Sequence, residues 1–181
     1  MEIYEVVLLI TASFFAGIIN SIAGGGSFLT FPALVFAGVP TIAANATSAV
    51  AVFPGYLSGA LGFAKELKAF PKSKFLLLIF LSISGGVLGS ILLLITPEVV
   101  FSFIIPWLLG FATLLFAFGN YVSKLAEKTS DTNGFKSNIA TLLVCIYGGY
   151  FNGGLGIVLL ALFSTLGMRD IHLMNGLKNF M

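Results

Sequence analysis

The sequence predicts an all-α protein, a polytopic transmembrane helical bundle, and three observations support this fold class. Hydrophobic residues make up 58% of the 181 residues, and the mean hydropathy is +1.07. Charged residues make up only 9%, against roughly a quarter in soluble domains, so they cannot cover a water-exposed surface. The apolar runs are continuous, whereas an outer-membrane barrel shows short strands that alternate apolar and polar residues. We therefore exclude a soluble globule, a disordered chain and a nucleic-acid-binding protein.

The uncharged runs predict where the helices lie, because a helix needs about 20 apolar residues to cross the hydrocarbon layer. Residues 6–64 carry no charge and are long enough for two crossings with residues to spare. Residues 75–97 and 99–123 each predict one crossing, and residues 137–168 predict one long or broken crossing. The first helix is expected to be retained, since a signal peptide starts with positive charge and this chain starts with two glutamates.

The lysines predict the orientation, since short cytoplasmic loops of membrane proteins are rich in lysine and arginine. Four lysines lie in residues 65–74 and three in residues 124–136, whereas the hairpin tip at residues 96–98 has none. Both basic loops are therefore predicted to be cytoplasmic and the tip exterior. The side of the N-terminus depends on whether residues 27–39 cross the membrane or dip in and return. We favour a crossing, which places the N-terminus outside.

An internal repeat becomes visible when the glycines are aligned. The sequence AGIIN at residues 16–20 recurs as GGYFN at residues 148–152, and glycines follow the asparagine in both copies. Each copy then runs through an apolar stretch and a glycine turn to a second asparagine motif, NATS at residues 45–48 and NGLK at residues 175–178. We therefore predict a first transmembrane repeat, a cytoplasmic basic loop and the start of a second, incomplete transmembrane repeat, at residues 1–123, 124–136 and 137–181.

Three consecutive glycines, Gly24, Gly25 and Gly26, predict a break in a membrane helix. Each weakens a helix by about 1 kcal/mol relative to alanine, and a broken helix in lipid must meet protein or line a cavity. The half-helix that begins near Ser27 would point its positive N-terminus into the membrane interior and could hold an anion there. Paired broken helices of this kind surround the substrate in many secondary transporters. Close packing is the alternative, which we favour for the small residues at positions 55 and 59 and at positions 82, 86 and 90.

Polar side chains inside the apolar runs are candidate substrate-binding residues, because an unpaired amide in a membrane is costly. Hydrogen bonding between helices could account for the asparagines, but they recur beside both glycine breaks. Thr47 and Ser48 could bond their own helix backbone or offer hydroxyls to an anion. Lys178 is the one cation within a repeated motif and would be the natural partner of an anionic substrate. The candidate site comprises Asn20, Gly24, Gly25, Gly26, Asn45, Thr47, Ser48, Asn152, Gly153, Gly154, Asn175 and Lys178.

The remaining residues indicate neither an enzyme nor a metal site. His172 is the single histidine, so this chain cannot supply a histidine triad to a metal, and Cys145 lies in an apolar run where packing explains it. Trp107 lies near the exterior end of its apolar run, as an interfacial anchor does. The sequence contains no zinc motif, serine–base pair or phosphate loop, so we expect no enzymatic activity and no cofactor.

These motifs also suggest a family. The segment AGIINSIAGGGS at residues 16–27, followed by FPAL at residues 31–34 and NATS at residues 45–48, resembles the TauE/SafE family of membrane transporters. The segment YGGYFNGGLG at residues 147–156 is similar to that family's second repeat. The resemblance implies a multi-pass carrier of the inner cell membrane, associated with export of sulfite, sulfoacetate and related sulfur-containing anions. Family members continue to further helices, so this chain looks like a fragment, a truncated protein or half of a larger assembly.

We therefore expect a secondary transporter that exports small anions such as sulfite or organosulfonates by alternating access. Its expected partners are the lipid bilayer and a small anionic substrate, together with missing C-terminal helices or further copies of the chain in a homo-oligomer. A channel-like protein, or a non-transporting membrane subunit that acts through partners, is the alternative.

Overall fold

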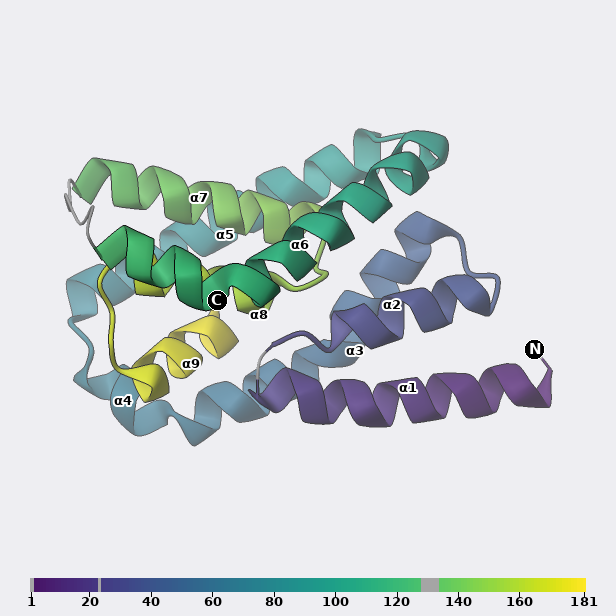
Figure 1. Ribbon diagram of the computed structural model, residues 1–181, viewed down its shortest axis with the longest axis horizontal. Coiled ribbons are helices and arrows are strands. Elements are labelled where there is room, and N and C mark those ends of the chain that lie inside the picture. Colours follow the sequence, from purple (N-terminus) through teal and green to yellow (C-terminus); the bar gives the residue numbers. More distant parts are fainter. Residues whose placement is uncertain (1, 23, 128–133) are drawn as a thin grey trace.

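The computed structural model describes residues 2–22, 24–127 and 134–181, and within these ranges the chain consists of helices joined by short connections (Figure 1). The prediction of an all-α protein is confirmed for this part of the chain. The helices are α1 (Ile3–Ile22), α2 (Ser27–Phe36), α3 (Thr41–Gly62), α4 (Ala64–Ala69), α5 (Lys72–Ile95), α6 (Glu98–Glu127), α7 (Gly134–Tyr150), α8 (Leu155–Thr165) and α9 (Ile171–Phe180).

Two of the described helices are long and apolar enough to cross a membrane. They are α1, over Ile3–Asn20, and α5, over Lys72–Ile95. Shorter apolar helices occur at Ser27–Phe36, Glu98–Leu114 and Leu155–Thr165. Short apolar half-helices such as α2 and α8 therefore occur beside longer ones, as expected of a membrane protein with discontinuous helices.

The helix bounds refine the predicted segments. The run at residues 137–168 is a broken one, because it is divided between α7 and α8. Helix α6 continues to Glu127 and α7 begins at Gly134, so helix extends into both ends of the basic loop predicted at residues 124–136. The centre of that loop, residues 128–133, lies outside the described residues. Helix α2 begins at Ser27, where the sequence predicts the start of a half-helix.

The turns gather at two opposite ends of the molecule (Figure 1). The N-terminus, the α2–α3 turn and the α5–α6 tip lie at one end, and α4 and the α8–α9 turn lie at the other. At the first end, the Glu98 carboxylate accepts hydrogen bonds from the Thr41 hydroxyl and, over 3.1 Å, from the Ile42 backbone N–H. The lysine-rich segment at residues 65–74 therefore lies at the end away from the N-terminus. This arrangement agrees with the interpretation that places the lysine-rich segment and the N-terminus on opposite sides of the membrane.

The most extensive helix contact is between α5 and α7, because small residues let the two backbones approach. A Cβ at Gly89 would collide with the backbone of Ile146, and a Cβ at Gly149 would collide with the backbone of Gly86. Cys145 is buried in the same interface. The packing interpretation of Cys145 is therefore confirmed, but the α5 glycines whose own Cβ would collide are Gly85 and Gly89, whereas a Cβ at the predicted Gly86 would meet nothing within 4 Å.

Candidate functional site

Both segments that contain the asparagine motifs are built as a helix, a joint, a half-helix, a turn and a further helix. The joint after α1 contains Gly24 at φ 79°, and the joint after α7 contains Gly154 at φ 71°. The turns that follow the half-helices contain Gly38 at φ 80° and Gly167 at φ 81°. Glycine adopts such positive φ values at no steric cost. Glycines with positive φ therefore shape the joint and the turn in both segments, although Gly24 and Gly154 stand at different distances from their asparagines.

The first joint touches the second joint's half-helix, α8, in the interior of the molecule. A Cβ at Gly24 would lie 2.8 Å from the Cα of Gly156, and a Cβ at Gly156 would lie 2.6 Å from the Cα of Gly24. The Asn152 amide donates a hydrogen bond of 3.2 Å to the hydroxyl of Ser27, the first residue of α2. The N-termini of α2 and α8 therefore meet, and the half-helices run from there toward opposite ends (Figure 1). Two helix N-termini give this point a partial positive charge.

Helix α3 holds the second joint in place through a buried asparagine. The Asn45 amide nitrogen donates to the Tyr150 carbonyl oxygen over 3.1 Å, and the amide oxygen accepts from the Asn152 N–H over 3.4 Å. Ser48 is also buried, and its hydroxyl lies 2.5 Å from that of Thr30 in α2. Hydrogen bonding between elements therefore accounts for Asn45 and Ser48.

Two buried polar side chains at the first joint have no partner in the part of the chain that the structure describes. Asn20 and Lys178 are each 2% exposed, and neither the Asn20 amide nor the Lys178 ammonium makes a hydrogen bond. A Cβ at Gly26 would lie 2.9 Å from the Cβ of Asn20, and a Cβ at Gly24 would lie 3.3 Å from the Cδ of Lys178. An unpaired buried polar group costs about 1–3 kcal/mol, and more when charged. The first joint therefore leaves the donor and the acceptor of the Asn20 amide unpaired, together with one buried cation.

The two asparagines of the repeated motif differ in their hydrogen bonds. Asn152, the counterpart of Asn20, finds a hydroxyl because α2 begins with Ser27. The first residue of α8 is Leu155, which has no hydroxyl to offer. One asparagine of the pair is therefore satisfied by the opposite half-helix and the other is not.

The same comparison between the two segments applies to Lys178. Ser48 is the eighth residue of α3 and pairs with Thr30, the fourth residue of α2. Lys178 is the eighth residue of α9, and the fourth residue of α8 is Val158. A hydroxyl pair in one half is thus replaced by a cation and an apolar residue in the other. The two groups that lack a partner among the described residues, the Asn20 amide and the Lys178 ammonium, therefore both lie at the first joint.

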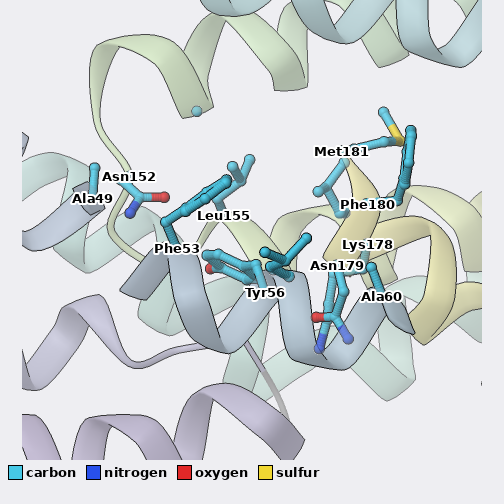
Figure 2. Close-up of a pocket in the computed structure, with 14 residues that line it drawn as sticks. Ala49, Phe53, Tyr56, Ala60, Asn152, Leu155, Lys178, Asn179, Phe180 and Met181 are labelled. Carbon is cyan, nitrogen blue, oxygen red and sulfur yellow. The ribbon is translucent and has the colours of Figure 1, made fainter. Parts of the chain in front are cut away.

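A cavity of about 290 Å³ lies between α3, the beginning of α8 and the end of α9 (Figure 2). Asn152 lies on one side of it, Lys178 and Asn179 lie on the other, and Tyr56 lies between them. The Tyr56 hydroxyl is 3.5 Å from the carbonyl oxygen of Gly24, so the cavity adjoins the first joint. Much of the remaining wall is apolar. The cavity thus offers a small anion one cation, two amides and a hydroxyl.

Several glycines of the predicted binding site pack against aromatic side chains. A Cβ at Gly25 or at Gly154 would meet the ring of Phe28, and a Cβ at Gly153 would meet the ring of Phe151. The absence of a side chain at these positions lets the rings approach the joints.

Of the twelve predicted site residues, only Asn152 and Lys178 line the cavity, and the other ten lie outside it. Thr47 is on the exposed face of α3. The Asn175 amide donates to the Ile171 carbonyl oxygen of its own helix over 3.0 Å. Their part in a binding site stays a prediction, as it does for the other candidates.

Sequence reasoning did not select Tyr56 and Asn179, which line the cavity. The Asn179 amide lies over Gly59 of α3, and a Cβ at Gly55 would lie 3.4 Å from the Asn20 amide nitrogen. The packing interpretation of these two glycines is therefore confirmed, but the groups packed on them are amides. A glycine pair that faces asparagines on two other helices is the signal that could have identified Asn179.

The chain is similar to membrane transporters in comparisons with known proteins. The family described as "Sulfite exporter TauE/SafE" matches residues 9–181. The "Probable membrane transporter protein ORF9" of Sinorhizobium sp is 32% identical over 158 residues, which are 87% of this chain and 60% of that relative. A "Probable membrane transporter protein" of Haemophilus influenzae is 27% identical over 163 residues, 90% of this chain and 64% of the relative.

A further relative is the "Probable membrane transporter protein YfcA" of Escherichia coli. It is 30% identical over 162 residues, which are 88% of this chain and 59% of the relative. The matched part of the chain thus spans 59–64% of the length of these curated relatives. No solved structure matches the chain.

Proposed function

The chain belongs to the TauE/SafE sulfite exporter family, a family of membrane transporters and not of enzymes, and on that premise we propose that it exports small anions such as sulfite or organosulfonates. The proposed mechanism is secondary transport by alternating access across the cell membrane. Because the chain spans less than two thirds of its curated relatives, the activity of the whole transporter is part of this proposal.

The observation that carries the proposal is the buried, unpaired ammonium of Lys178 near the meeting N-termini of α2 and α8. A buried cation is costly unless an anion and hydrogen bonds compensate it. The helix N-termini add partial positive charge, and Asn20 adds an unpaired amide. An oxyanion such as sulfite or a sulfonate supplies negative charge and several acceptor oxygens. The bound anion would compensate the Lys178 charge and could accept a hydrogen bond from the Asn20 amide nitrogen.

The proposed organisation is two repeats, with residues 1–123 as the first, residues 124–136 as a cytoplasmic loop and residues 137–181 as part of the second. Gly149 of α7 packs on α5, but its counterpart Gly17 in the aligned motif would meet nothing within 4 Å if it carried a Cβ. This bare face of α1 supports a second hairpin, equivalent to α5 and α6, that covers α1 in the complete transporter. The greater length of the curated relatives agrees with such a hairpin.

Anion binding is the first test, because it depends on the candidate site and does not require a complete transport cycle. Sulfite and sulfoacetate are expected to raise the melting temperature of the purified protein above that in chloride at equal ionic strength. Lys178→Met should abolish this stabilisation while it raises the stability of the anion-free protein by about 1–4 kcal/mol, because it removes a buried unpaired charge. Lys65→Met, which removes an exposed lysine, is the matched control and should change neither quantity.

Flux into proteoliposomes is the second test. A carrier should show sulfite or sulfoacetate uptake that saturates with concentration and that Lys178→Met abolishes. Uptake that rises linearly with concentration would favour the channel-like alternative. An anion-induced stabilisation that survives unchanged in a folded Lys178→Met variant would overturn the site.

A further inference from the structure

A second hollow, separate from the candidate anion site, lies between the end of α3, α4 and the start of α5. Its volume is about 420 Å³. The wall is apolar apart from two lysines, Lys68 and Lys72. Its apolar lining includes Leu57, Leu61, Leu67, Phe70, Phe75 and Phe180. We refer to it as the α4 groove.

The chain path between α3 and α5 creates the α4 groove. Helix α4 has only six residues, and Pro71 separates it from α5. One side of α4 is held against α9, since a Cβ at Gly176 would lie 3.3 Å from the Cγ of Leu67. Leu61 at the end of α3 is left 68% exposed. The short helix therefore bridges two longer ones without filling the space between them.

The two lysines lie where lipid head groups are expected. Lys72 is the first residue of α5, a helix long enough to cross the membrane, so it marks the boundary of the hydrocarbon layer. Lys68 lies in the last turn of α4, in the loop whose four lysines predict a cytoplasmic location. The cytoplasmic leaflet is rich in anionic lipids, each of which attracts nearby lysines by about 1 kcal/mol per residue.

We propose that the α4 groove binds an anionic phospholipid, with an acyl chain along its apolar wall and the phosphate group between Lys68 and Lys72. Such a lipid combines the two properties that the groove requires, a long apolar segment and a negative head group at its end. A soluble phosphate would satisfy the lysines and leave the apolar wall uncovered. A zwitterionic lipid would cover the wall and carry no net charge to the lysines.

The lipid would also adjoin the candidate anion site. Leu57, Ala60 and Phe180 line both the α4 groove and the cavity that contains Lys178. An acyl chain in the groove would therefore pack against the other side of the wall that these residues form, and would stabilise that wall. The lipid site itself rests on the groove and its lysines alone and does not depend on the transported substrate.

Native mass spectrometry of the purified chain with added phosphatidylglycerol or phosphatidylcholine tests the proposal. Phosphatidylglycerol should remain bound more tightly than phosphatidylcholine. The double variant Lys68→Gln/Lys72→Gln should lower its affinity by about tenfold or more, because two lysine attractions are lost. All four loop lysines are exposed, so Lys65→Gln/Lys74→Gln removes the same charge from the same loop, outside the residues that line the groove.

The outcomes separate the proposal from its competitors. Equal loss of phosphatidylglycerol in both double variants would show a general surface charge effect and overturn the site. Equal retention of the two lipids by the unaltered chain would show a purely apolar contact and overturn it too. Displacement of the lipid by millimolar inorganic phosphate would identify a soluble anion as the occupant. Leu61→Gln, a change at an exposed position, should weaken binding of both lipids if the acyl chain lies in the groove.

Discussion

Gly24 of the first joint lies in backbone contact with Gly156, the second residue of α8, and each stands four positions after the asparagine of its motif, Asn20 or Asn152. Corresponding residues of the two segments therefore face each other, as residues do where an approximate two-fold axis passes between repeats. Neither glycine can carry a side chain unless the backbone of the other moves.

Alanine at this contact should therefore destabilise the protein. We expect Gly24→Ala and Gly156→Ala each to lower the free energy of unfolding by about 1–3 kcal/mol, because each added Cβ overpacks the joint. Gly24→Ala should have the larger effect, since its φ of 79° also disfavours alanine. Thermal unfolding in detergent measures the change. Gly17→Ala, at a helix position with open space around it, is the control, and equal stability of Gly156→Ala and Gly17→Ala would contradict the contact.

Asn45 should be a stabilising residue of the second joint. Asn45→Ala removes the partner of the Tyr150 carbonyl and of the Asn152 N–H, and the loss should cost about 1–3 kcal/mol of unfolding free energy. Thr47→Ala, two positions away on the exposed face of the same helix, should change stability by less than about 0.5 kcal/mol. Chemical or thermal unfolding of the two variants under the same conditions provides the comparison. A Thr47→Ala variant as unstable as Asn45→Ala would argue against the role of the asparagine.

Glu98 should make stability depend on pH at the α5–α6 tip. The hydrogen bond from the Thr41 side chain, together with backbone hydrogen bonds that include that of Ile42, holds the pKa of Glu98 below its ordinary value of 4.5 despite some desolvation. A lowered pKa in the folded state means that the ionised form stabilises the fold. This contribution is complete above pH 4.5 and is lost as the pH falls through the folded-state pKa.

The difference in melting temperature between the unaltered chain and Glu98→Gln measures this contribution. It should be constant near neutral pH and shrink below about pH 4.5, because protonation makes the two side chains alike. Glu66→Gln in α4, at the opposite end of the molecule (Figure 1), is the control for a general charge effect. A difference that grows on acidification would refute the assignment.

The α5–α7 interface predicts opposite effects for two glycines of one helix. A Cβ at Gly89 would lie 2.6 Å from the backbone nitrogen of Tyr150, so Gly89→Ala should force the helices apart and cost about 1–3 kcal/mol. A Cβ at Gly86 would meet nothing within 4 Å. Gly86→Ala should therefore leave stability unchanged or raise it by up to about 1 kcal/mol, the helix preference of alanine over glycine. Melting temperatures of the two variants test this prediction. A similar decrease for Gly89→Ala and Gly86→Ala would contradict it.

The sequence was sufficient to predict features that depend on local physics. Runs free of charge predicted α5 and α6, and consecutive glycines predicted that α2 begins as a separate half-helix at Ser27. These features follow from the cost of charge in lipid and of glycine in a helix. They require no knowledge of which segments touch.

The pairing of the polar groups could not be predicted in the same way. Asn20 and Asn152 stand in matching motifs, yet only Asn152 finds a hydroxyl, because its partner Ser27 belongs to the opposite half-helix. Asn45 looked like a cavity-lining candidate and instead bonds the backbone at Tyr150 and Asn152. Such partners are set by the meeting of distant segments, so a periodic pattern within one segment carries no information about them.

The division of the molecule into packed bodies differs from its division into sequence segments. Helices α5 and α6 belong to the first predicted repeat, yet α5 packs chiefly on α7 and α6 chiefly on α8, whereas α1, α2 and α3 pack on one another and α3 packs most extensively on α9. In a rocking motion of one body against the other, α5 and α6 would travel with α7 and α8. The boundary between the two bodies would then cross the chain at α4 and again between α8 and α9, rather than at residues 124–136. The lysine-rich stretch at residues 65–74 would then be one of the connections that bend when the two bodies move.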